Sequence, residues 1–271
     1  LSGTQPAGSL CTGPMAYTGQ AQLEADIANA KRALKGKAVT DLFFPCASVG
    51  TVEGAVINRH YSTEDEYLEA VSETMRVEYE AIVAAGFSIQ LDDPRLAMQH
   101  MLEPSMSVED ARRWAHRRVE AMNRSIRNIP SDRVRHHTCY GINMGPRTHD
   151  FEMKHLIDII LKINADFYSF EYGNPRHEHE WKLWENVTLP EGKALLPGVI
   201  THASVLVEHP ELVAERIVKF ASVVGKENVI ASTDCGFAST PRALPEVHDT
   251  IVDAKFRSLV EGARLASKQL F

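Results

Sequence analysis

Short apolar segments alternate with amphipathic helical segments along this chain, and this alternation constrains its fold more than any other feature. The apolar segment 87–91 precedes a helical repeat that begins at Val108, and the apolar segment 194–200 precedes another that begins at Val213. Strands that alternate with helices in this way usually pair in parallel, with the helices covering the sheet. The pattern therefore predicts an α/β protein built on a parallel sheet.

Two α/β architectures compete for this pattern. A doubly wound sheet normally carries a glycine-rich phosphate turn after an early strand, and neither common form of that turn is present. A (β/α)₈ barrel (TIM barrel) instead gathers reactive side chains where several different strands end. We therefore expect a barrel, as a single domain over residues 1–271. The residues at these strand ends are Asp92, Asp93, His137, Cys139, Glu171, Asp234 and Cys235.

The number of strands and the composition set further limits. The sequence offers fewer strands than the eight of a closed barrel, so we expect the amino-terminal strands of the barrel to lie outside it.

With 271 residues, of which 44% are hydrophobic and 24% charged, the chain can build one sizeable core. The net charge of −7 is spread out and there is no Lys/Arg block, which argues against nucleic acid as a partner.

No apolar run reaches the ~18 residues that a membrane-spanning helix needs, and we expect neither a membrane segment nor a secretory signal. The oligomeric state is not fixed by the sequence, which is compatible with a homo-oligomer.

The cysteines are too few for a disulfide scaffold, which favours reduced thiols in the cytoplasm. They are Cys11, Cys46, Cys139 and Cys235.

His137 and Cys139 stand two residues apart on a predicted strand, so their side chains share one face. An imidazole together with a thiol favours zinc over magnesium or calcium. If Glu171 and Cys235 lie at the same rim, the four ligands give a zinc site of formal charge about −1. Such a site is a weak Lewis acid, but it keeps a bound thiol deprotonated and nucleophilic, so alkylation of sulfur is expected rather than hydrolysis.

The alternative is that Cys139 and Cys235 are buried apolar thiols and that His137 is a satisfied polar residue. Cys11 and Cys46 have no ligand-type neighbour, and we expect them to be structural. The run 176–180, Arg-His-Glu-His-Glu, has the composition of a set of metal ligands, but alternating charges in a loop are more typical of a solvated face or of residues that support metal ligands.

At these positions the sequence resembles the cobalamin-independent methionine synthase family, in the catalytic barrel that this family shares with epoxyalkane:coenzyme M transferase. Residues 89–94 resemble its I-Q-I-D-E-P strand, 137–139 its H-x-C, 170–171 its I-E and 234–236 its D-C-G. The resemblance implies a zinc-dependent barrel that transfers the methyl group of 5-methyltetrahydrofolate, as its polyglutamate, to homocysteine and forms methionine. It implies that Asp92 binds the amino group of homocysteine. The zinc ligands that it implies are His137, Cys139, Glu171 and Cys235.

Three features depart from the family pattern. Asp93 replaces the usual glutamate, and the strands that bind the carboxylate of the amino acid are expected outside this sequence. The catalytic histidine of the family lies in a G-V-Y-D-I-H-S segment, where this chain has Ala203, with His202 as its neighbour. His202 is therefore our candidate for the proton donor, provided that a loop or bulge turns it toward the site.

The leading interpretation is a zinc-dependent thiol alkyltransferase that acts on a small-molecule thiol and an alkyl donor. A related alternative keeps the zinc site and changes the electrophile, for example to an epoxide. A second alternative is a metal-free barrel that resembles the uroporphyrinogen decarboxylases and uses Asp92 with arginines. A third is a non-catalytic binding barrel in which zinc is structural.

Overall fold

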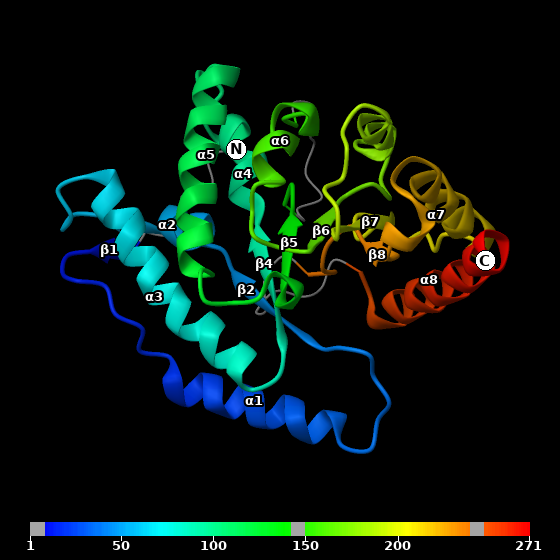
Figure 1. Ribbon diagram of the computed structural model, residues 1–271, viewed down its shortest axis with the longest axis horizontal. Helices are drawn as coiled ribbons and strands as arrows, with labels where there is room; N and C mark the ends of the chain where they lie inside the picture. The colour runs from blue at the N-terminus through cyan, green and yellow to red at the C-terminus, as the bar shows by residue number, and fades with distance from the viewer. Residues whose placement is uncertain (1–8, 142–149, 239–246) are drawn as a thin grey trace.

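The computed structural model describes residues 9–141, 150–238 and 247–271. Its main feature is a curled sheet of six parallel strands, in which spatial neighbours follow one another in chain order (Figure 1). A separate parallel pair joins β1 (Ser9–Cys11) and β3 (Val56–Asn58). The six strands are β2 (Phe43–Ala47), β4 (Ser88–Asp93), β5 (Val134–Thr138), β6 (Phe167–Phe170), β7 (Ala194–Ile200) and β8 (Ser232–Thr233).

The strand order decides between the two architectures. In a doubly wound sheet the order reverses at a switch point, whereas here β2, β4, β5, β6, β7 and β8 advance in one direction. Within the described part of the chain, β2 and β8 form the two edges of the sheet. The protein therefore forms an arc of a (β/α) barrel, which confirms the predicted fold class in a partial form.

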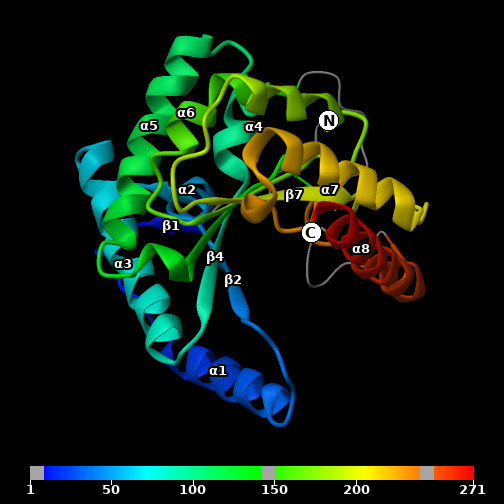
Figure 2. The same cartoon turned by 45° about the vertical axis from the view of Figure 1, so that its right-hand side comes forward.

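Helices cover the outer side of this arc. In the two views α3 and α5 lie over the β2 to β5 part of the sheet, and α7 and α8 lie beside β7 and β8 (Figures 1 and 2). No described helix is long and apolar enough to cross a lipid bilayer. The helices are α1 (Gln20–Leu34), α2 (Val49–Ala55), α3 (Glu64–Ala84), α4 (Pro94–Leu102), α5 (Val108–Ser125), α6 (Ile157–Ile160), α7 (Pro210–Val224) and α8 (Asp249–Leu270). Single 3₁₀ segments are η1 (Ser131–Arg133), η2 (Met153–His155), η3 (Glu178–Glu185) and η4 (Lys226–Asn228).

Local signals set several of these boundaries. Thr63 and Glu66 form a capping box at the start of α3. The Ser107 side chain accepts a hydrogen bond from the backbone N–H of Asp110 at the start of α5. Gly225, with φ +90°, follows the last turn of α7, in a backbone region that favours glycine.

Three segments differ from the sequence-based expectation. The glycine and asparagine content between Pro45 and Tyr61 predicts a loop, but the segment contains α2 and β3, whose short sequences lack a clear period. The helix expected around residues 156–163 is limited to α6. The strand expected over residues 228–235 is limited to β8, because η4 and one isolated bridge, from Leu195 to Val229, occupy its first half.

The core lies between the sheet and its helices. A large apolar cluster joins α3, α5 and the strands, with members such as Leu68, Ile89 and Val134. A smaller cluster that includes Val213 and Ala266 packs α7 and α8 against β7. The carboxyl ends of the strands are thereby held on a rigid support.

Candidate metal centre

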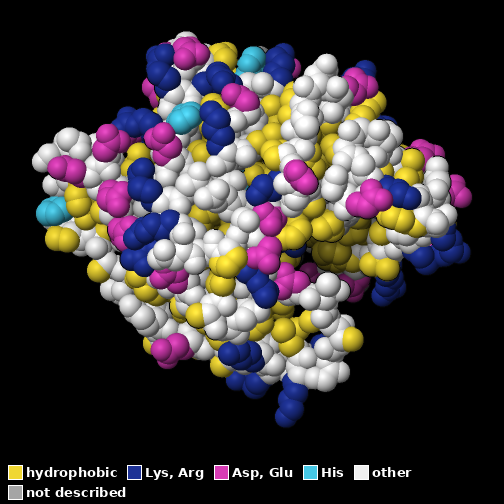
Figure 3. Space-filling view, viewed as in Figure 1, with side chains coloured by type: hydrophobic (Ala, Val, Ile, Leu, Met, Phe, Trp, Pro, Cys, Tyr) yellow, Lys and Arg dark blue, Asp and Glu magenta, His cyan; other side chains and the backbone are white. Residues whose placement is uncertain are grey.

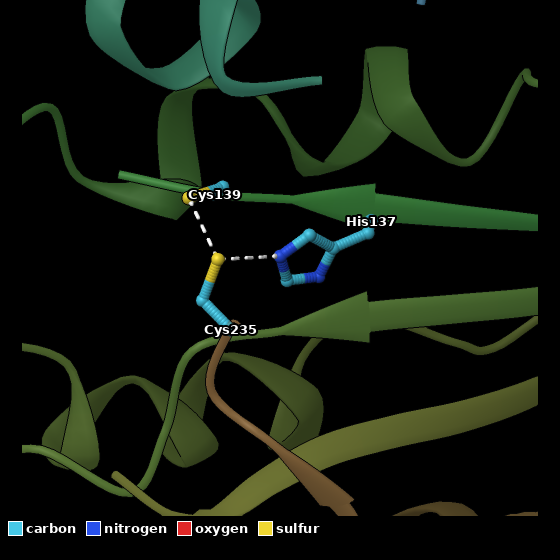
Figure 4. A group of neighbouring side chains, drawn as sticks. All are labelled: His137, Cys139 and Cys235. Atoms are coloured by element: carbon cyan, nitrogen blue, oxygen red, sulfur yellow. Dashed lines mark hydrogen bonds between the residues drawn. The ribbon is translucent and has the colours of Figure 1, made fainter. Parts of the chain in front are cut away.

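Three side chains converge at the carboxyl rim of the sheet. His137 lies in β5, Cys139 follows the end of β5, and Cys235 follows β8. The Cys235 sulfur lies 3.3 Å from the Cys139 sulfur and 3.4 Å from His137 Nε2, and it stands between them (Figure 4). One ligand atom from each residue lies within 4.8 Å of the other two. The sequence-predicted H-x-C pair and the distant cysteine are thus brought together.

The geometry of this group fits a tetrahedral metal ion with nitrogen and sulfur ligands. Zinc–sulfur bonds of about 2.3 Å at tetrahedral angles place two sulfurs about 3.7 Å apart. The observed 3.3 Å requires a movement of only a few tenths of an ångström. His137 Nδ1 lies 3.1 Å from Ser169 Oγ, which orients the ring so that Nε2 faces the sulfur atoms. The residues present therefore fit zinc.

Burial and mutual contacts shift the pKa values of the groups at this site. The hydrogen bond with Cys235 and burial raise the pKa of Cys139 well above its usual value. Burial lowers the pKa of His137, but the neighbouring Cys139 sulfur and the carboxylates of Asp92 and Glu171 outweigh it and raise the pKa overall. A divalent cation would reverse the effect on the thiols, because thiolates are the form that binds metal.

Glu171, the fourth predicted ligand, lies in a neighbouring group with His202 and Asp234, in which the ligand atoms are also within 4.8 Å of one another. Its Oε1 accepts the backbone N–H of Tyr140 at 2.8 Å, and Tyr140 directly follows Cys139. Its Oε2 accepts bonds from Asn174 and Arg176, both at 3.2 Å. Of the four predicted ligands, the structure brings three into one group and places Glu171 beside it.

Asp234 anchors the segment that carries Cys235. Its Oδ1 accepts the backbone N–H groups of Tyr172 at 2.8 Å and Gly173 at 2.6 Å, and its Oδ2 accepts from Asn174 at 2.9 Å. Burial raises the pKa of Asp234 and of Glu171, and for Glu171 the adjacent Asp234 adds to the increase. Asp234 thus ties the end of β8 to the loop after β6.

His202 lies two residues past β7 and is 2% exposed. The strand has ended at Ile200, so the loop is free to direct the imidazole toward Glu171 and Asp234. The loop is held by Glu208, whose Oε1 accepts the backbone N–H of Thr201 at 2.8 Å. The His202 ring therefore lies with the two carboxylates and not with the sulfur atoms, and its role as proton donor stays a prediction.

The two consecutive aspartates of β4 face opposite sides. Asp92 pairs in register with His137 and accepts a bond from Gln90 Nε2 at 2.9 Å, and burial raises the pKa of its carboxyl group. Asp93 is fully buried on the other side and caps α4 through the backbone N–H groups that follow it. Only Asp92 faces the candidate site.

A cavity of about 430 Å³ lies inside the arc and reaches the three-residue group through His137 and Cys235. On the side of the molecule where β2 faces α8, the surface is hollowed and apolar side chains line the hollow (Figure 3). Arg135 also lines the cavity, and burial lowers the pKa of its guanidinium to about 10. Sequence reasoning missed Arg135, although its position two residues before His137 places it on the same face. The remaining lining residues include Phe43, Pro45, Asp92, Phe237 and Phe256.

The run 176–180 lies beside Glu171 and is partly buried: His177 and Glu180 are buried, whereas His179 is exposed. Arg176 contacts both Glu171 and Asp150. His177 is 2% exposed, and its two ring nitrogens lie 3.0 Å from Glu180 and 3.3 Å from Asp150. Neither group of possible metal ligands in the described residues includes a member of this run, so the structure favours a supporting role over a set of ligands.

The comparisons of this chain with known proteins agree on one family. Residues 50–255 match the sequence model of the family described as cobalamin-independent synthase, catalytic domain. A methionine synthase of Sulfurisphaera tokodaii is 26% identical over 216 residues, which are 79% of this chain and 53% of that protein. The chain thus spans about half the length of this curated relative.

Solved structures with the same fold include two at 19% identity. A B12-independent methionine synthase from Shewanella sp. W3-18-1, in complex with selenomethionine, superposes with a TM-score of 0.72, covering 96% of this chain and 71% of that one. A protein from Listeria monocytogenes, described as a putative vitamin-B12 independent methionine synthase, gives a TM-score of 0.66, with 96% and 72% covered. The family match extends over most of the chain and includes every residue of both groups at the rim. The chain therefore belongs to the family of the cobalamin-independent synthase catalytic domain.

Proposed function

We propose that this protein is a zinc-dependent thiol alkyltransferase that methylates homocysteine with 5-methyltetrahydrofolate. The observation that carries the proposal is the convergence of His137, Cys139 and Cys235 at the rim of a barrel sheet. The family match and the methionine synthase named among the relatives support the reaction class. Cytoplasmic location and a single catalytic domain belong to the same proposal.

The three converging residues would hold the zinc ion, with Glu171 as the fourth ligand. When bound, zinc supplies a cation that keeps the acceptor thiol deprotonated while leaving it nucleophilic. Asp92 lines the adjoining cavity and would bind the ammonium group of the acceptor, which positions its sulfur. Holding both reactants in one orientation accounts for much of the acceleration in reactions of this kind.

His202 would deliver a proton to the leaving group of the donor. Its buried position next to two carboxylates can hold a proton inside the site and away from bulk water. The donor's nitrogen leaves poorly without protonation, so this group is needed for methyl transfer.

Zinc content tests the assignment most directly. The purified protein is expected to carry about one zinc per chain, and the Cys235→Ser variant is expected to lose it, because one of the two sulfur ligands is gone. Cys11→Ser is the matched control, since Cys11 is a buried thiol on β1 outside both groups. Elemental analysis after dialysis gives the answer, and full zinc occupancy in the Cys235→Ser variant would refute the ligand set.

Epoxide opening by a thiol is the second candidate, favoured by one observation: Ala203 stands where the synthases carry their proton-donating histidine. Consumption of a thiol should be compared with methyltetrahydrofolate and with a simple epoxide as the electrophile. Turnover of methyltetrahydrofolate alone supports methyl transfer, and turnover of the epoxide alone supports the second candidate. Zinc that is bound but never changes its coordination when thiol is added would indicate a structural site.

A further inference from the structure

A buried serine faces His137 from the neighbouring strand. Ser169 lies on β6, is 2% exposed and stands in register with His137 of β5. Its Oγ lies 3.1 Å from His137 Nδ1, and both residues line the cavity of about 430 Å³. The hydroxyl group of Ser169 therefore contacts a candidate metal ligand directly, inside the site.

Strands β5 and β6 carry matched pairs of residues at the rim. His137 and Cys139 are two residues apart at the end of β5, and Ser169 and Glu171 have the same spacing at the end of β6. Ser169 contacts His137, and Glu171 accepts the backbone N–H of Tyr140, which directly follows Cys139. The Ser-x-Glu pair of one strand thus lies against the His-x-Cys pair of the other.

The two ring nitrogens of His137 have different surroundings. Nε2 points to the Cys235 sulfur at 3.4 Å (Figure 4), whereas Nδ1 lies against Ser169. A neutral imidazole carries one N–H proton, and only the nitrogen without that proton can bind a metal ion. If Nε2 is the ligand atom, the proton is on Nδ1. Because His137 is 5% exposed, this N–H group needs an acceptor within the protein.

Ser169 offers such an acceptor without adding a charge. Metal-binding histidines usually donate their second N–H group to a carboxylate, a backbone carbonyl or water, which fixes the tautomer and the ring orientation. A hydroxyl oxygen accepts in the same way but is neutral, so the charge of the site remains that of its ligands. The acidic residue in register with His137 on the other neighbouring strand is Asp92, whose Oδ1 accepts from Gln90. The hydroxyl group of Ser169 is therefore the partner of Nδ1.

We propose that Ser169 is a positioning residue for the metal, whose hydroxyl group accepts the Nδ1–H of His137 and so fixes Nε2 as the ligand atom. The inference rests on the proposed function, which assigns zinc to His137. Without the hydroxyl group the buried N–H loses its acceptor. The ring is then free to turn, or to carry its proton on Nε2, and both changes oppose metal binding.

The test compares two substitutions at Ser169. Ser169→Ala removes the hydroxyl group and should weaken zinc binding about 10–100-fold, the usual cost of losing the partner of a ligand histidine. Ser169→Thr keeps the hydroxyl group on a residue type that strands favour, and it should restore most of the affinity. Ser88→Ala is the matched control, since Ser88 is 2% exposed at the start of β4 and its hydroxyl group bonds to Asp41. Competition with a chelator of known zinc affinity measures all four proteins.

A second readout follows the proton itself. In the zinc-loaded protein with isotope-labelled histidine, nuclear magnetic resonance should show that the Nδ1–H of His137 exchanges slowly with water. Ser169→Ala should accelerate this exchange, and Ser88→Ala should leave it unchanged. A general loss of packing would instead lower the urea midpoint of the metal-free protein, which is expected to change equally little in both alanine variants.

The outcomes separate this inference from the proposed function. Equal zinc affinity in the wild type and Ser169→Ala, or equal weakening in Ser169→Ala and Ser169→Thr, overturns the role of the hydroxyl group even if the wild type transfers methyl groups. Zinc binding that depends on the hydroxyl group, in a protein that does not methylate homocysteine, upholds the role of Ser169 and refutes the proposed function. A wild type that binds no zinc refutes both.

Discussion

At the scale of single residues, the candidate site depends on buried charges that constrain one another. Glu171 is held by three donors, and one of them, Arg176, is itself paired with Asp150. His177 stacks on Tyr140 with ring centroids 3.8 Å apart. The position of Glu171 beside the sulfur group therefore depends on a network that continues well beyond the rim.

His177 should make stability depend on pH. Burial disfavours its charged form, but the hydrogen bonds with Asp150 and Glu180 outweigh this and raise its pKa to about 9 from 6.5. Because the folded pKa is the higher one, the stabilisation is complete below pH 6.5 and is lost as the pH rises through 9. The loss amounts to about 3 kcal/mol at most.

The groups that face His177 are Asp150, Glu180, Arg176, Glu171 and the stacked ring of Tyr140. Urea unfolding of the wild type between pH 6.5 and 9 should show this decline, and the His177→Gln variant should show a flatter profile. His116→Gln, on the exposed face of α5, should keep the wild-type profile. Parallel profiles for the wild type and His177→Gln would contradict the assignment.

Single residues also show where sequence reasoning reached its limit. His137 and Cys139 could be predicted as a pair, because the period of a strand fixes the face on which they lie. The division between Glu171 and the sulfur group could not, because it depends on which donors surround each carboxylate. Arg135 could not be recognised as a cavity residue, because the cavity is formed by segments that are distant in the sequence, such as Phe43 and Phe256.

At the scale of elements, the rim is shaped by how closely β7 and β8 approach each other. A Cβ at Gly198 would overlap Asp234 Oδ1 and lie 2.6 Å from Asp234 Cα. Glycine at this position thus allows the Asp234–Cys235 segment to lie against β7. The sequence placed Cys235 at the end of a strand, but it could not reveal that β8 is only two residues long, since that depends on this contact.

Gly198→Ala should therefore displace the segment that carries Cys235. We expect a loss of about 1–3 kcal/mol in stability from the steric overlap, together with weaker zinc retention. Gly236→Ala provides the comparison, because a Cβ there would meet nothing within 4 Å. Thermal unfolding and zinc content measured on both proteins test this, and wild-type zinc retention in Gly198→Ala would show that the close approach is dispensable.

At the scale of the whole molecule, a buried ion pair joins the last helix to the rim. Lys255 of α8 is fully buried and bonds to Glu208 at 2.8 Å and to the backbone oxygen of Leu206. Glu208 in turn holds the backbone of Thr201, next to His202. The alternation of strands and helices predicts that α8 covers the sheet. The contact between Lys255 and Leu206 could not be predicted, because the two residues are about 50 positions apart and form no local sequence pattern.

Removing the lysine should destabilise the protein strongly. Lys255→Met would leave the Glu208 carboxylate buried and unpaired, at a cost of about 3–5 kcal/mol. The double variant Lys255→Met/Glu208→Gln should recover part of this loss. Lys268→Met, on the exposed end of α8, should have little effect. Urea midpoints measure all three, and an unchanged midpoint for Lys255→Met would show that the pair contributes nothing.

The parallel sheet also determines when the rim can assemble. Long connections separate the strands that pair in it: Phe43 pairs with Ser88, and His137 lies 98 positions before the cysteine sulfur that it contacts. Loops of this length close slowly, so such ladders form late in folding. During synthesis on the ribosome, the three-residue group at the rim consists of His137 and Cys139 alone until Cys235 emerges. Capture of the proposed zinc ion would therefore require that translation has passed this point and that β8 has docked.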